Sequence, residues 1–251
     1  MALSPQIREE LLSHARLVSR AAPPSGPVRS HVLFVGNSHT FVNDLPACVS
    51  QIDPGLATFS VTAGGQTLAG HLRTGTALRE IGSGRYDVVV LQEQSVTPLL
   101  SPDAFESALA EFARASRAQR ARPILYETWS RTKPDDPAFA ASGSAGPTDM
   151  AVRLEEEFSS ATGKFGVERA RVGTAFSSLQ IQGRGEGLIA EDGSHATPAG
   201  TYLAALVIVR AITKKPLPDP APRCFTNLGV NERALLRAAR DVDLKTGPER
   251  P

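Results

Sequence analysis

Residues 31–41, which read HVLFVGNSHTF, decide the fold of this chain. An apolar run of strand character leads into Gly36, and the run stops there. Three small, polar or ionisable residues follow the glycine, and the chain then takes on the pattern of a helix. A strand that ends in glycine and passes into a helix is typical of α/β proteins. Here the turn between them presents Ser38.

Four further segments have the same strand character: residues 57–65, 86–94, 122–129 and 167–173. Helical spacing of apolar residues lies between the strands, over residues 43–52, 67–80, 102–120 and 147–162. Short apolar strands that alternate with helices predict a parallel sheet with helices on both faces. We therefore expect an α/β fold of flavodoxin-like type, a three-layer α/β/α sandwich around a five-stranded parallel sheet.

The 251 residues are expected to form one folded domain with an N-terminal extension. Residues 1–29 predict a short amphipathic helix and a Pro-rich linker, and the domain is expected to span residues 30–245. Residues 130–147 are rich in Pro, Gly and Ser and predict a loop long enough to be a lid or binding loop. A buried helix is predicted after Thr197 and Pro198, and a last amphipathic helix near residues 231–243.

Composition narrows the possible partners and location. The net charge is +1, so nothing favours nucleic acid or an acidic membrane surface as a partner. The N-terminus has no apolar core of signal-peptide type, and no segment has the roughly 20 apolar residues that span a bilayer, so we expect a cytoplasmic location. Cys48 and Cys224 have no metal-type spacing; they are either free thiols or one disulfide, and we favour free thiols.

Candidate chemistry follows the strands, because ligands of open α/β sheets bind beyond the carboxyl ends of the strands. GNSHT follows the first strand, AGGQTL the second and QEQS the third, and EDGSHATPAG precedes the buried helix. Asp192 and His195 lie three residues apart in the last segment, so the carboxylate can orient the imidazole. On their own they could equally be exposed loop residues. Together with Ser38 they supply a nucleophile, a base and the carboxylate that orients the base.

These segments resemble the SGNH (GDSL-type) hydrolase superfamily, in a branch where the GDS block is written GNS. The resemblance implies that Ser38 is the nucleophile and that Asp192 and His195 are the D-x-x-H pair. It also implies that the backbone N–H groups of Ser38 and Gly65 form part of an oxyanion hole. No cofactor and no metal are implied.

The chain departs from the superfamily pattern at two places. Asn37 replaces the Asp of GDS, at a position that shapes the loop and does not react. The G-x-N-D block, whose Asn donates to the oxyanion, is replaced by LQEQS. We expect Gln94 to be the third oxyanion donor, with Gln92 as the second choice, although both glutamines could instead satisfy loop backbone.

The expected function is cofactor-free hydrolysis of a short-chain ester, with O-acetylated carbohydrate as the favoured substrate. A lipase, thioesterase or acyltransferase would use the same triad. A flavodoxin-like module that binds phosphate in the first loop is a further alternative. Trp129 is expected either in the core or as an apolar wall of the substrate site, and His39 is expected to be structural.

Overall fold

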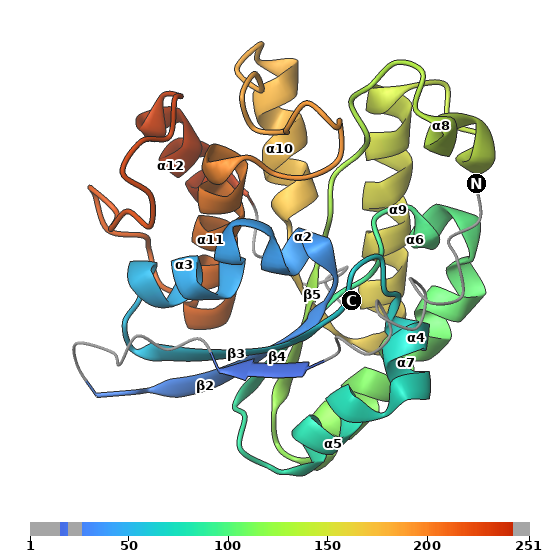
Figure 1. The fold of residues 1–251 in the computed structure, drawn as a ribbon, viewed down its shortest axis with the longest axis vertical. Helices are drawn as coiled ribbons and strands as arrows, with labels where there is room; N and C mark the ends of the chain where they lie inside the picture. The colour runs from blue at the N-terminus through green and yellow to red at the C-terminus, as the bar shows by residue number, and fades with distance from the viewer. Residues whose placement is uncertain (1–15, 20–26, 243–251) are drawn as a thin grey trace, which may run out of the picture.

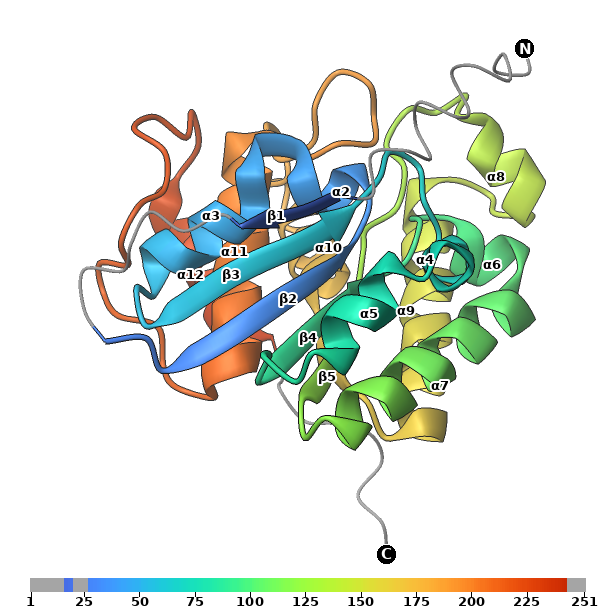
Figure 2. The ribbon, with the colours of Figure 1, turned by 60° about the horizontal axis from the view of Figure 1, so that its bottom comes forward.

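The computed structural model describes residues 16–19 and 27–242, which form a six-stranded sheet between two layers of helices (Figures 1 and 2). The strand order is β1-β3-β2-β4-β5-β6. Five strands are parallel: β2 (Ser30–Gly36), β3 (Leu56–Thr62), β4 (Val88–Gln92), β5 (Arg122–Tyr126) and β6 (Glu168–Ala170). They lie within the predicted segments to one residue at either end. Their spatial order is the 2-1-3-4-5 order of flavodoxin-like folds, which confirms the predicted three-layer α/β/α sandwich.

The sixth strand corrects one expectation. Residues 16–19, assigned from sequence to the N-terminal helix and linker, form β1 (Arg16–Ser19), which pairs antiparallel with β3. An edge strand leaves a row of unpaired backbone groups, and β1 satisfies those on the outer side of β3. The rest of the predicted helix and most of the linker lie outside the described residues.

Helices cover both faces of the sheet (Figure 2). One layer contains α3 (Leu45–Ile52), α10 (Val172–Ile181), α11 (Pro198–Thr213) and α12 (Glu232–Asp241). The other contains α4 (Leu68–Thr74), α5 (Thr76–Gly82), α7 (Pro102–Ala118) and α9 (Pro147–Phe165). Strand residues alternate between the two layers: Val32 and Phe34 pack against the first, and Leu33 and Val35 against the second.

Two helical segments differ from the sequence prediction. The predicted helix over 67–80 is two helices, α4 and α5, because Gly75 has a φ of 71° and ends the first helix where the second begins. Helix α10 was not predicted, and it begins two residues after β6, inside the segment expected to be strand. The 130–147 segment is a loop as predicted, and it contains the short helix α8 (Pro137–Ser142).

Helix α11 is the buried helix that the Thr-Pro signal predicted. Thr197 caps it by accepting a hydrogen bond from the backbone N–H of Gly200 at 3.2 Å, and Pro198 is its first residue. Among residues 16–19 and 27–242, no helix combines the length and the apolar run that crossing a bilayer requires.

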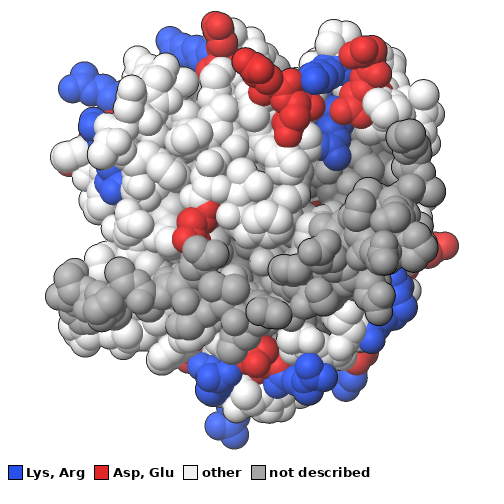
Figure 3. Space-filling view, in the orientation of Figure 1, with Lys and Arg blue, Asp and Glu red and all other residues white. Residues whose placement is uncertain are grey.

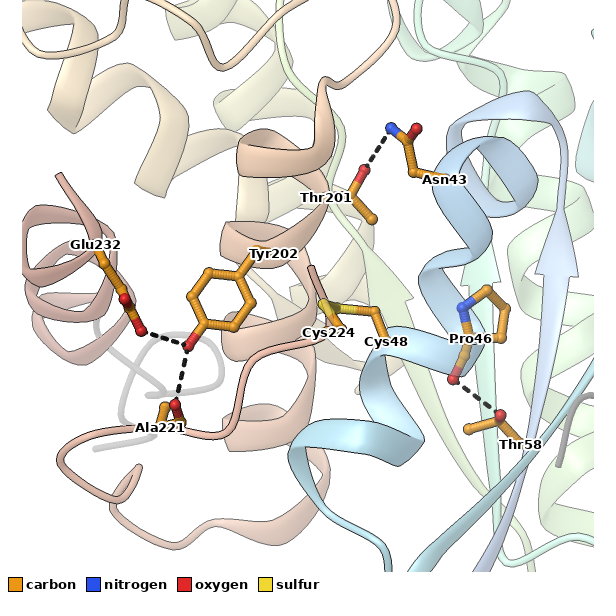
Figure 4. Close-up of a disulfide and its surroundings, with 9 residues drawn as sticks. All are labelled: Asn43, Pro46, Cys48, Thr58, Thr201, Tyr202, Ala221, Cys224 and Glu232. Carbon is orange, nitrogen blue, oxygen red and sulfur yellow. Dashed lines mark hydrogen bonds between the residues drawn. A yellow bond between two sulfur atoms is a disulfide. The ribbon is translucent and has the colours of Figure 1, made fainter. Parts of the chain in front are cut away.

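The two cysteines are bonded, which corrects the expectation of free thiols. Figure 4 shows the disulfide between Cys48 on α3 and Cys224 in the segment that follows α11. Their Cα atoms are 5.0 Å apart because this segment turns back over α11, where Ala221 O accepts from Tyr202 Oη at 3.4 Å. Disulfides are rare in reducing compartments, so this pair counts against the predicted cytoplasmic location.

Candidate functional site

The turn after β2 positions Ser38. Asn37 links the turn to both neighbouring strand ends: its backbone N–H donates to Gln92 Oε1 and its side-chain amide to Gln66 O, each at 2.8 Å. Its Oδ1 accepts from the backbone N–H of His39, and Asn37 thereby caps the short helix α2 (Ser38–Phe41). The Asn that replaces the Asp of GDS therefore shapes the loop, as its position in the sequence suggested.

Ser38, His195 and Asp192 lie in hydrogen-bond contact. Ser38 Oγ is 2.8 Å from His195 Nε2, and His195 Nδ1 is 2.5 Å from Asp192 Oδ2. Oδ1 of Asp192 also accepts from the backbone N–H groups of Ser194 and His195, at 2.8 and 2.9 Å. The imidazole thus has one nitrogen toward a carboxylate and the other toward a serine hydroxyl, the arrangement that lets it take a proton from that hydroxyl.

Asp192 is held in its ionised form. Partial burial alone raises the pKa of Asp192, but hydrogen bonds from the His195 side chain and from the backbone N–H groups of His195 and Ser194 outweigh it. The resulting pKa is about 2. The carboxylate is therefore charged at any pH near neutrality, as an orienting group for an imidazole must be.

The loop that carries Asp192 and His195 is fixed by the segment after β5. Trp129 Nε1 donates to Ser194 O at 2.9 Å, and the backbone N–H of Thr132 donates to Gly193 O at 3.0 Å. The Trp129 ring is buried and stacks on Phe176 of α10, with ring centroids 4.3 Å apart. Of the two roles left open for Trp129, the structure places it in the core beneath the loop.

His39 lies closer to the site than the sequence suggested. Its buried ring lies between Trp129 and His195, at centroid distances of 4.8 and 5.4 Å. Burial, with smaller effects of Arg131 and His195, lowers the pKa of His39 to about 3. The ring is therefore neutral and adds no positive charge beside His195. Its position directly after Ser38 was the only signal in the sequence.

The candidate oxyanion donors have different environments. Gly65 is exposed and has a φ of 64°, in the left-handed region that favours glycine, and a Cβ atom there would meet no atom within 4 Å. Gln94 is half-buried; its Oε1 accepts from Val96 N, Thr97 N and Thr97 Oγ1 at 3.0–3.1 Å. Within the described part of the chain, no acceptor takes a hydrogen bond from the N–H groups of Ser38 and Gly65 or from Gln94 Nε2.

Gln92, the second choice as an oxyanion donor, makes hydrogen bonds within the fold. It is fully buried, and its Oε1 accepts from Asn37 N and Thr40 Oγ1, each at 2.8 Å. Its Nε2 donates to Glu93 O at 2.5 Å. Its carbonyl oxygen and one of its amide N–H groups serve the turn and the loop backbone, so these contacts favour Gln94 over Gln92 as the third donor.

His71, a histidine outside the site, serves the fold. Buried His71 holds α4 to the end of β2 through Nε2, which lies 2.8 Å from Gly36 O. Among the residues that the structure describes, no three His, Cys, Asp or Glu side chains lie close enough together to hold a metal ion.

The visible surface around these elements has no broad patch of one charge. On the face in Figure 3, Lys and Arg (blue) and Asp and Glu (red) lie mainly toward the margins, and its middle is mostly uncharged. Among the described residues, this distribution agrees with the balanced composition.

Comparison with known proteins identifies relatives through structure. No family model matches the sequence, and no curated protein matches it. A protein from Slackia heliotrinireducens assigned to the SGNH hydrolases is 30% identical, with a TM-score of 0.63, covering 74% of this chain and 98% of the other. A DUF4886 family protein from Bacteroides uniformis is 16% identical with a TM-score of 0.69, covering 86% of this chain and 94% of the other.

An acetylxylan esterase from Geobacillus stearothermophilus has the same fold at 15% identity and a TM-score of 0.50, covering 75% of this chain and 94% of the esterase. The likeness to the Slackia protein assigns the family, because the two chains are 30% identical and the likeness covers 98% of that protein. On that ground this chain belongs to the SGNH hydrolase superfamily.

Proposed function

We propose that the chain is a serine ester hydrolase in which Ser38 forms an acyl-enzyme. The observation that carries the proposal is the continuous set of contacts from Ser38 Oγ through His195 to Asp192, at 2.8 and 2.5 Å. A serine hydroxyl attacks an ester only when a neighbouring base removes its proton, and an orienting carboxylate stabilises the imidazolium that results.

The proposed reaction has two halves. His195 takes the proton of Ser38 as Ser38 Oγ bonds to the ester carbonyl carbon, and the C–O bond to the alcohol breaks as His195 returns the proton to the leaving oxygen. Water then attacks the acyl-enzyme with the same help from His195, releasing the acid and restoring Ser38. The backbone N–H groups of Ser38 and Gly65 and Nε2 of Gln94 are the proposed donors to the oxyanion.

The exposure of the site supports a short acyl group on a bulky, hydrated alcohol. The side chains of Asp192 and His195 are 48% and 33% exposed, so the triad lies at the surface. A carbohydrate can approach such a site without being buried, whereas a long acyl chain needs an enclosed apolar channel. We therefore favour O-acetylated carbohydrate as the substrate class, in line with the acetylxylan esterase that shares the fold.

We also propose that residues 30–245, with β1 completing their sheet, act as one hydrolase domain and that the segment before β1 takes no part in the chemistry. A chain beginning at Arg16, which keeps β1, should keep the kcat of the full chain. Loss of activity from a folded truncated chain would assign a catalytic role to the missing segment.

The predicted cytoplasmic location needs its own experiment. Fractionation of the native host, with thiol labelling before lysis, would decide in which compartment the protein lies.

Hydrolysis of p-nitrophenyl esters from acetate to octanoate tests the central proposal. We expect acetate to have the highest kcat/KM, and Ser38→Ala to lower kcat by more than about 1,000-fold. Ser178→Ala, which changes a partly exposed serine on α10, should leave the rate unchanged. A fluorophosphonate should label Ser38 in the native chain. Equal rates for Ser38→Ala and the native chain would end the proposal.

A further inference from the structure

Glu93 is a buried carboxylate that the reaction described above does not use. It follows β4 directly and is 0% exposed. Among the described residues no Lys, Arg or His forms an ion pair with it; only burial and two backbone N–H groups act on its charge. A buried carboxylate without a counter-ion is costly, because little replaces its hydration. Burial accordingly raises the pKa of Glu93 to about 7.

The two backbone N–H groups belong to the two loops that hold proposed oxyanion donors. The N–H of Leu68 lies 3.2 Å from both carboxylate oxygens, and the N–H of Gln94 lies 2.6 Å from Oε1. Leu68 begins α4, three residues after Gly65. A single carboxylate therefore joins the loop of Gly65 to the loop of Gln94.

Asn37 is a second link between the two loops, since it binds Gln66 O and Gln92 Oε1 from the side of the Ser38 turn. Oε1 of Gln94 is held within its own loop by Val96 and Thr97. Glu93 is the link that reaches the backbone N–H groups of Leu68 and Gln94 themselves.

We propose that Glu93 is a positioning residue that sets the spacing between the Gly65 N–H and the Gln94 amide. The inference rests on the proposed function, because it concerns donors to the same oxyanion. Such donors act when they lie about 2.7–3.1 Å from the developing charge, and a displacement of about 1 Å costs on the order of 100-fold in rate. A neutral side chain of the same size packs equally well but holds only one of the two N–H groups.

Glu93→Gln tests the proposal, with Glu127→Gln as the matched control. Glu127 is also a buried carboxylate just beyond a strand end; it accepts from the backbone N–H of Thr174 at 2.6 Å and, unlike Glu93, forms an ion pair with Arg169 at 3.2 Å. With p-nitrophenyl acetate at pH 8, we expect Glu93→Gln to lower kcat about 10- to 100-fold with KM within about twofold. Glu127→Gln should keep kcat within about threefold.

A double-mutant cycle with Gln94→Ala separates positioning from general damage. If Glu93 acts through the oxyanion donors, Glu93→Gln should cost much less in a Gln94→Ala background than in the native chain. Equal losses in both backgrounds, or the same small loss as in Glu127→Gln, overturn the proposal. Should Glu93→Gln fail to fold, Glu93→Asp, which keeps the charge and shortens the reach, takes its place with the same expected loss. Failure of both variants to fold also overturns it, since Glu93 would then serve the fold.

Ser38→Ala keeps the two proposals distinguishable. If Ser38→Ala is inactive while Glu93→Gln behaves like its control, the esterase proposal stands and the role of Glu93 is wrong. If Ser38→Ala remains active, the proposed chemistry itself fails.

Discussion

Asp192 is the residue whose charge keeps His195 in place. Because hydrogen bonds lower the pKa of Asp192 to about 2, its charge is constant across pH 5–8. Any loss of activity toward the acid end of that range must therefore come from a group other than Asp192.

Asp192→Asn should lower kcat by up to about 10,000-fold, because an amide cannot stabilise the imidazolium by charge and permits the wrong ring tautomer. Asp103→Asn, at an exposed position in the first turn of α7, is the control and should leave kcat unchanged. An unaltered kcat in Asp192→Asn would remove Asp192 from the reaction.

Glu93 should make the stability of the protein depend on pH. Its pKa is about 7 in the folded chain and about 4.5 in the unfolded chain, so its contribution to stability is fully present below about pH 4.5 and is lost as pH rises through 7. We compare the free energy of unfolding of the native chain with that of Glu93→Gln. The native chain should lose up to about 3 kcal/mol relative to the variant between pH 5 and 8. Urea unfolding at pH 5, 6, 7 and 8 measures this difference, and a constant value would show that Glu93 does not titrate there.

Strands and helices with one clear signal were predictable, and elements fixed by long-range contact were not. The first four parallel strands followed from apolar runs, and α11 from its Thr-Pro start. Helix α10 has the helical spacing Val172, Ala175, Phe176 and Leu179, but the strand predicted over residues 167–173 included its first two residues. The point where the strand ends is set by tertiary contact, since a Cβ on Gly173 would come 2.1 Å from Thr128 O.

The candidate site was likewise predictable only in part. Its three central residues follow from motif order and from the rule that strand ends meet at one edge of a sheet. The choice between Gln92 and Gln94 depends on which amide the Asn37 turn occupies, and that contact spans 55 residues. Sequence spacing carries no information on such a contact.

The segment after β5 acts on the catalytic loop through Trp129. Trp129→Phe keeps the stack on Phe176 and removes the donor to Ser194 O, next to His195. We expect a loss of about 1 kcal/mol in the free energy of unfolding and a fall in kcat of about 3- to 10-fold, because the loop gains freedom. Tyr86→Phe removes a hydroxyl donor to Glu80 far from the site and should lower stability without changing kcat. A kcat loss in both variants alike would mean that the Trp129 hydrogen bond has no special role.

At the scale of the molecule, α3 and the turn that precedes it are joined to the C-terminal part of the chain by two contacts. Near the site, the side-chain amide of Asn43 donates to Ala196 O at 2.8 Å and to Thr201 Oγ1 at 3.0 Å. Further away, the disulfide joins Cys48 to Cys224 (Figure 4). The first contact ties the Ser38 turn to the His195 loop, and the second closes a long loop of chain.

Because the disulfide spans 176 residues, it should stabilise the folded chain mainly by restricting the unfolded one. Cys48→Ser with Cys224→Ser should lower the free energy of unfolding by about 2–5 kcal/mol in urea, while kcat at 25 °C stays within about twofold because the Asn43 contacts remain. Reducing agent should destabilise the native chain by a similar amount and leave the double variant unaffected. Two titratable thiols in unreduced, denatured protein would show that the bond does not form. In that case the cytoplasmic prediction would lose the observation that opposes it.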